Sequence, residues 1–114
     1  MDGGGFKRVV LFKFKEGVAV EEMLNGLKKL FSEIDLVKSA EWGEAADIEG
    51  SGASATAALP SPAKGFTHAV VMRFDSQEDC LAFMTHPAHV ELGATFLDAV
   101  DDFLGLNFPV LSLK

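Results

Sequence analysis

Alternating apolar and polar positions predict the strands of this chain. Residues 6–14 alternate between two faces, and both faces have apolar side chains at the centre, as in a strand that is covered on both sides. Residues 67–74 show the same two-residue period, with one uniformly bulky face. Two further stretches, 37–43 and 103–110, are predicted as the other strands of one sheet.

Apolar residues spaced by three and four positions predict the helices. Residues 20–34 have this spacing throughout. Ser76 begins a capping box that predicts a helix to about Thr85, and the His86-Pro87 step ends this helix and begins another over 87–100. The apolar side of the last helix is expected to be Val90, Gly93, Ala94, Leu97 and Val100. Its small residues, Ala88, Gly93 and Ala94, are expected to allow close packing.

The order of these elements predicts an α+β fold. Strand, helix, strand, loop, strand, two helices and strand is the ferredoxin-like plan, a four-stranded antiparallel sheet with its helices on one face. The low-complexity residues 44–64 are the loop. The other sheet face bears Phe and Val rather than polar residues, so it needs a cover. A second copy of the sheet is the economical cover, and we expect a homodimer through this face.

Composition limits the class of protein further. At 114 residues the chain is expected to be one domain over 6–110, between a flexible N-terminus at 1–5 and a short tail at 111–114. The net charge of −7 argues against binding nucleic acid or an anionic membrane. Because Cys80 is the single cysteine, an internal disulfide is excluded, and a reducing compartment, the cytoplasm, is the simplest expectation. Cys80 itself is expected to be a small buried hydrophobe.

Four segments in their order and spacing indicate a family. They are FKRVVLFKFKEGV at 6–18, VKSAEWGE at 37–44, GFTHAVVMRF at 65–74 and HPAHVE at 86–91, and the last strand ends in Asn107-Phe108-Pro109. The chain resembles the stress-response A/B barrel family of dimeric α/β barrel proteins, which is common in plants. The resemblance implies two four-stranded sheets that join into an α/β barrel. It also implies a non-catalytic homodimeric stress-response protein that binds a small apolar ligand.

The resemblance implies an alternative function as well, that of a polyketide-cyclase-like or other cofactor-independent proton-transfer enzyme. A polyketide cyclase of this family uses the histidine of the HPAHV motif as a base, which is His89 here. The tyrosines of that enzyme fall at Phe83 and Leu27, and this chain contains no tyrosine. His68, Arg8 or a water would then have to supply the hydrogen-bond donor.

Structural roles for the two candidate catalytic histidines, His89 and His68, are the competing interpretation. His89 can bond to the sheet or line the dimer contact, and His68 can donate to a backbone carbonyl or to His89. His86 is expected to end a helix, and a metal site from His86 and His89 lacks a third ligand.

Arg8 interrupts an apolar strand face, where its guanidinium can hold a carboxylate or enolate or can pair with an acidic residue. A pocket for a small apolar or aromatic ligand is predicted between helices and sheet, lined by Arg8, Val10, Phe12, Leu24, Leu27, Val70, Phe83 and Leu92. No organic cofactor is expected. Family members hold a divalent cation on carbonyls of the turn after the first helix, which implies a structural Mg²⁺ on the backbone of Phe31, Ile34 and Val37.

Overall fold

The computed structural model describes residues 5–46 and 64–114. Its elements are β1 (Phe6–Phe14), α1 (Val20–Glu33), β2 (Ser39–Glu44), β3 (His68–Phe74), α3 (Gln77–Thr85), α4 (Pro87–Ala99) and β4 (Val100–Pro109). These elements confirm the α+β, ferredoxin-like order that the sequence predicted. Most of the predicted loop at 44–64, and all but Gly5 of the predicted flexible N-terminus, lie outside the described residues.

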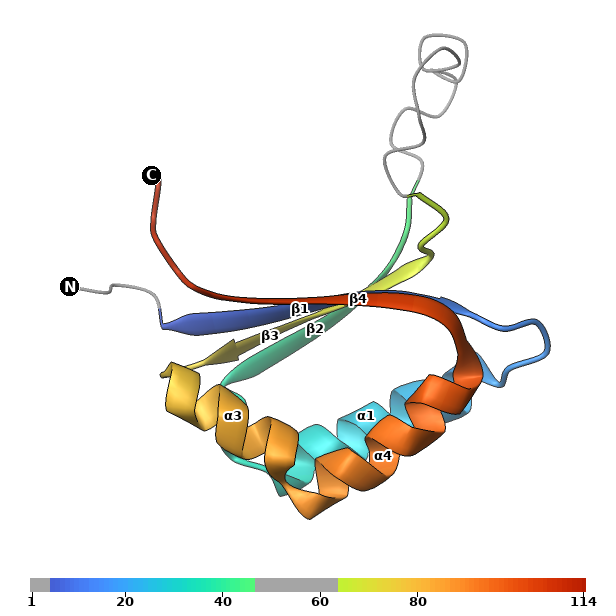
Figure 1. Cartoon of the computed structure of the whole chain (residues 1–114), viewed down its shortest axis with the longest axis horizontal. Helices are drawn as coiled ribbons and strands as arrows, with labels where there is room; N and C mark the ends of the chain where they lie inside the picture. Colours follow the sequence, from blue (N-terminus) through green and yellow to red (C-terminus); the bar gives the residue numbers. More distant parts are fainter. Residues whose placement is uncertain (1–4, 47–63) are drawn as a thin grey trace, which may run out of the picture.

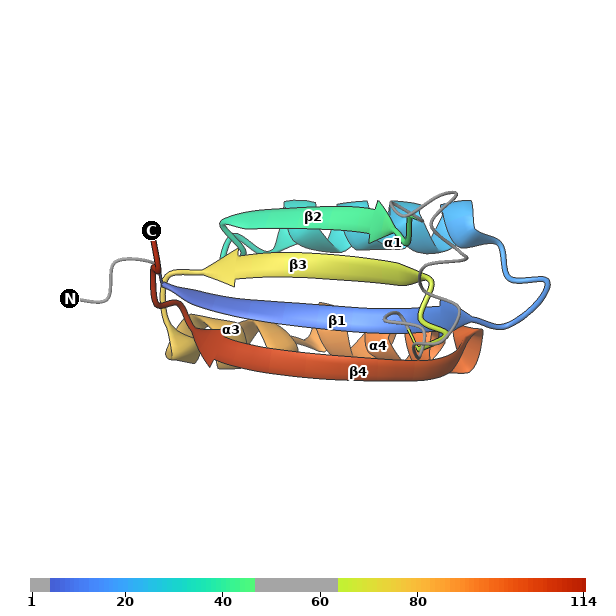
Figure 2. The same cartoon turned by 90° about the horizontal axis from the view of Figure 1, so that it is seen from above.

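The four strands form one antiparallel sheet in the order β2-β3-β1-β4 (Figure 2). The three helices α1, α3 and α4 lie together on one face of the sheet (Figure 1). We call this face the inner face and the opposite one the outer face. None of these helices is both long and apolar enough to cross a membrane.

The core lies between the inner face and the helices. Alternation along β1 and β3 places every second side chain inward, and the largest fully buried side chains come from both layers: Phe12, Phe74 and Phe83. Cys80 is 3% exposed, and burial raises the pKa of its thiol, so it is the buried hydrophobe that the sequence predicted.

The outer face has an apolar stripe that no described element covers. Val9 pairs with Leu106 and Leu11 pairs with Leu104 across β1 and β4, and we call these four residues the outer stripe. Leu104 is 54% exposed and Leu106 is 60% exposed. This row of large apolar side chains exposed to water is the uncovered apolar sheet face that the sequence pattern predicted.

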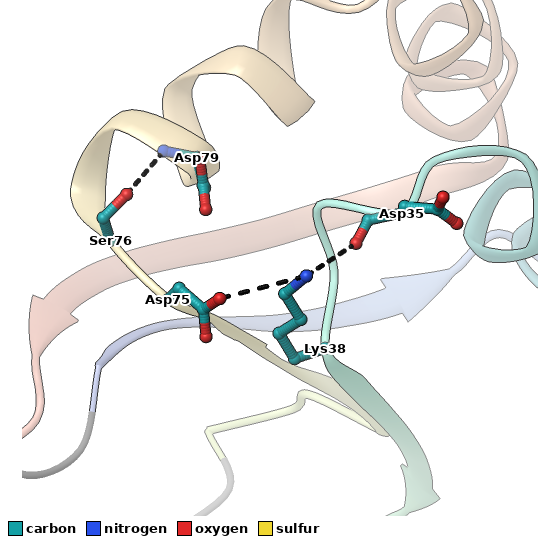
Figure 3. Close-up of polar contacts among 5 residues, drawn as sticks. All are labelled: Asp35, Lys38, Asp75, Ser76 and Asp79. Atoms are coloured by element: carbon teal, nitrogen blue, oxygen red, sulfur yellow. Dashed lines mark hydrogen bonds and ion pairs between the residues drawn. The ribbon is translucent and has the colours of Figure 1, made fainter.

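Two hydrogen bonds fix the helix starts around α3 and α4. Ser76 Oγ accepts the backbone N–H of Asp79 at 3.1 Å (Figure 3), which confirms the predicted cap. His86 ends α3 and also caps α4, since its Nδ1 accepts the backbone N–H of Ala88 at 3.1 Å. The His86 ring therefore has a structural role at the helix junction.

No cluster of three or more potential metal-ligating His, Cys, Asp or Glu side chains exists within 5–46 and 64–114.

The structure corrects the strand boundaries and the packed side of α4. β4 begins at Val100 rather than at residue 103, because the Ala99 carbonyl is already bonded to the Lys15 N–H at 2.9 Å. β2 begins at Ser39 rather than at residue 37. The residues of α4 that pack on the core are Ala88, Leu92, Phe96 and Ala99, whereas the predicted Val90 and Leu97 are mostly exposed.

Candidate functional site

A cavity of about 440 Å³ lies between the inner sheet face and the helices. That volume is in the range of small-molecule sites, and the lining is almost entirely apolar. Of the residues predicted for a pocket, the structure brings together Arg8, Val10, Phe12, Leu27, Val70, Phe83 and Leu92, and His89 joins them. Leu24 and His68 do not line the cavity.

Small residues on the helices shape this cavity, although not as expected. The close approach of helices is at Gly26 of α1, where an added Cβ would lie 3.1 Å from Cδ1 of Leu92. At Gly93 an added Cβ would meet nothing within 4 Å. The prediction of close packing at Gly93 is therefore wrong, and the missing side chain leaves space in the cavity wall.

Arg8 is the one permanently charged residue that the described ranges contribute to the cavity lining. Its Nη1 donates to Oδ1 of Asn107, its cross-strand partner on β4, at 2.7 Å. An added Cβ at Gly105 would lie 3.0 Å from Nη2, so the guanidinium lies against β4 in the space that this glycine leaves. Burial lowers the pKa of Arg8, and Cys80 partly opposes the shift. The acidic partner considered for Arg8 is absent from the described residues, since its partner is a neutral amide.

His89 contributes the second polar side chain of the lining, from the start of α4. Its ring packs edge-on against Phe83, with 4.8 Å between centroids. Its Nδ1 is buried and has no hydrogen-bond partner among the described residues. Burial is the main cause that lowers the pKa of His89. The backbone carbonyl of Met84 partly opposes this shift, and the positive charge of Arg8 adds to it. The ring is therefore neutral at neutral pH.

His68 lies in a different environment. Its Nδ1 is 2.7 Å from the Thr67 hydroxyl, and its ring stacks on Phe12 at 5.7 Å and packs against Trp42 at 5.3 Å. The predicted bond to a backbone carbonyl or to His89 is not found, because the Thr67 hydroxyl is the hydrogen-bond partner of this ring among the described residues. The structure does not bring the two candidate catalytic histidines into one lining.

Sequence reasoning missed Asn107 and Gly105, the residues that position Arg8. Their role depends on the register of β1 with β4, in which Arg8 faces Asn107 and Val10 faces Gly105. The available signal was a polar Asn and a Gly two residues apart in the otherwise apolar stretch 103–110. Two chain segments 99 residues apart have no local pattern that sets their register.

The turn after α1 is the candidate cation site. The carbonyls of Phe31, Ile34 and Val37 accept no hydrogen bond from the described part of the chain, so their oxygens suit a hard cation. The same turn already has an ammonium group. Nζ of Lys38 lies 3.3 Å from the Asp35 carbonyl and 3.9 Å from Oδ2 of Asp75 (Figure 3). A Mg²⁺ ion here stays a prediction.

Stability is expected to depend on pH through His89. Because its folded pKa lies below the ordinary value of 6.5, the unfolded chain binds a proton more readily. The contribution of the uncharged His89 to the free energy of unfolding is fully present above pH 6.5, and it is lost as the pH falls from 6.5 through the folded pKa. Urea unfolding over a pH series should show this decline, and His89→Gln should lack it. The same dependence of the unfolding free energy on pH in both proteins would contradict the assignment of the decline to His89.

In Arg8→Met the pKa of His89, followed by NMR, should rise, because the positive charge of Arg8 helps to lower it.

Comparison with known protein sequences gives two findings. A model of the stress-responsive A/B barrel domain family matches residues 6–110. A stress-response A/B barrel domain-containing protein of Arabidopsis thaliana is 43% identical over 114 residues, which is 100% of this chain and 94% of the relative.

Solved structures add likeness of fold. The hydroxynitrile lyase of Passiflora edulis matches with a TM-score of 0.79 at 21% identity, over 96% of this chain and 95% of the lyase. A protein of unknown function from Thermobifida fusca, described as dimeric and ferredoxin-like, matches with a TM-score of 0.69 at 23% identity, over 95% and 92% of the two chains.

Proposed function

The chain belongs to the stress-responsive A/B barrel domain family, and from this we propose that it is a non-catalytic, homodimeric stress-response protein that binds a small apolar ligand. The observation that supports ligand binding is the cavity of about 440 Å³, to whose lining the described residues contribute only two polar side chains, Arg8 and His89. A mainly apolar cavity with few polar groups is the usual form of a small-molecule site.

The uncovered outer face supports the homodimer. The outer stripe leaves large apolar side chains in water, and beside it lies a hollow of about 460 Å³ lined in part by Leu11, Phe66 and Leu104. The tail after β4 leaves the sheet on the side away from the helices (Figure 1), and its Leu111 and Leu113 are 82% and 94% exposed. A second copy related by a two-fold axis would cover these surfaces at once.

The lining itself supports a binding role over catalysis. At Phe83 and Leu27, where the resemblance places the cyclase tyrosines, the side chains have no hydroxyl group. Phe83 is 1% exposed and packs on the His89 ring. Beyond Arg8, no described residue of the lining has a side-chain donor that could stabilise an enolate oxygen beside a base at His89.

Filling the cavity wall is expected to weaken ligand binding. In Gly93→Leu the new side chain has space, since nothing lies within 4 Å of an added Cβ, so the fold should be kept. The apolar fluorescent probe N-phenylnaphthylamine should bind the wild type, and its affinity should fall about tenfold or more in this variant. Ala82→Leu, at an exposed position of α3 outside the cavity, is the matched control. Equal affinity in all three proteins would place the probe elsewhere and contradict the cavity as the ligand site.

A second candidate function is a proton-transfer enzyme with His89 as the base. The observation that favours it is the neutral ring with a buried, unpartnered Nδ1 in the cavity region. The Passiflora relative of this fold is a hydroxynitrile lyase, which indicates one reaction to assay besides cyclisation of a linear polyketide thioester. Saturable turnover by the wild type that His89→Gln loses would establish this function in place of the first. Absence of turnover on both substrates would count against it.

A further inference from the structure

The charge inside the cavity indicates what kind of ligand it takes. We infer that the ligand is an amphipathic monoanion, whose aromatic or alkyl body fills the apolar part of the cavity and whose carboxylate binds the Arg8 guanidinium. This inference rests on the proposed ligand-binding function and specifies the chemistry of the ligand. It depends on the geometry of Arg8, on the absence of a counter-charge and on the composition of the lining.

The guanidinium is held in place and still has donors to offer. Nη1 donates to the Asn107 amide oxygen at 2.7 Å, and this is the one hydrogen bond that the Arg8 side chain makes within the described residues. The other N–H groups of its planar fork remain for a ligand. Gly105 has no side chain beneath the fork, so the group lies flat against β4 at the cavity instead of being pushed into solvent. A fork held in this way suits the two oxygens of a carboxylate.

No group in the described part of the chain neutralises this charge. Among residues 5–46 and 64–114, the cavity lining contains no Asp or Glu. A half-buried cation among apolar side chains has lost part of its hydration without gaining a counter-ion. A carboxylate would supply that counter-ion. Arg8 is the one permanently charged residue that the described part of the chain contributes to the lining, and one negative charge on the ligand matches it.

A pair of ligands with the same body tests the inference. para-Pentylbenzoate and para-pentylbenzamide differ only in their head group, which is an anion in the first and a neutral amide in the second. Calorimetric titration near neutral pH should show that the wild type binds the benzoate about tenfold to a hundredfold more tightly than the amide. In Arg8→Met, which keeps an apolar stem of similar length, the two affinities should become equal or reverse in order. Arg8→Lys should keep part of the preference, because it keeps the charge but loses the fork.

The outcomes separate this inference from the function on which it rests. If the wild type binds both compounds with equal affinity, or the amide more tightly, the cavity binds ligands but the anion inference is overturned. If Arg8→Met keeps the preference for the benzoate, the inference is also overturned, because the anion then binds another group. If neither compound binds, the proposed ligand-binding function fails together with it. Should Arg8→Met not fold, Arg8→Lys decides, because an undiminished preference for the benzoate in that variant would overturn the inference.

Discussion

Replacing Leu106 with Glu is expected to convert the protein from a dimer into a folded monomer. Leu106 lies in the outer stripe beside Val9 and is 60% exposed in the single chain. In the proposed dimer it is covered by the partner sheet, and a two-fold axis buries two new carboxylates at once. An unpaired buried carboxylate costs several kcal/mol, about 3 or more, so the dissociation constant should rise at least about a hundredfold.

The control for this prediction is Leu81→Glu. Leu81 is 62% exposed, nearly the same as Leu106, but it lies on α3, on the helical side of the sheet (Figure 1). Light scattering at micromolar concentration should give a dimer for the wild type and for Leu81→Glu, and a monomer for Leu106→Glu. A dimer in all three proteins would show that the outer face is not the interface. A monomeric wild type would contradict the homodimer itself.

The sequence predicted the layers of the fold because the layers follow from local periodicity. Two-residue alternation identifies β1 and β3, and the cap at Ser76 marks the start of α3 within one residue. In α4 the same reasoning chose the wrong side, because apolar residues surround most of the helix and the period does not select one face. Only the packing of Leu92 and Phe96 against the core shows how this helix is rotated.

The candidate site could be predicted in part for a related reason. Alternation tells which face a strand residue occupies, and it placed His68, Val70 and Met72 together on the inner face. It does not tell how far along the strand the cavity lies. Alternation alone therefore leaves His68 as a catalytic candidate beside His89, whereas in the structure its ring packs with Phe12 and Trp42. The anchoring of Arg8 by Asn107 depends on strand register, which the turns and contacts of the whole fold determine.

Phe12→Ala is expected to cause the largest loss of stability among single changes in the core. Phe12 is fully buried, and its ring contacts Phe14 at 5.1 Å, Phe96 at 4.9 Å and Trp42 at 5.5 Å between centroids. These partners belong to β1, α4 and β2, so the one side chain connects the central strand to a neighbouring helix and to the edge of the sheet. Removing a buried Phe costs about 3–5 kcal/mol, which is a large part of the roughly 5–15 kcal/mol that stabilises a domain.

The neighbouring strand provides a matched control, because Phe12 pairs in register with Phe103 of β4. Phe103 also lines the cavity but is 44% exposed, so Phe103→Ala should cost about 1 kcal/mol. Urea unfolding must be compared at one protomer concentration, because the stability of a dimer depends on concentration. Equal losses in the two variants would mean that the chain is stabilised mainly by its partner sheet. A much larger loss at Phe12 would show that the inner core stabilises each protomer, so that Leu106→Glu can separate the protomers without unfolding them.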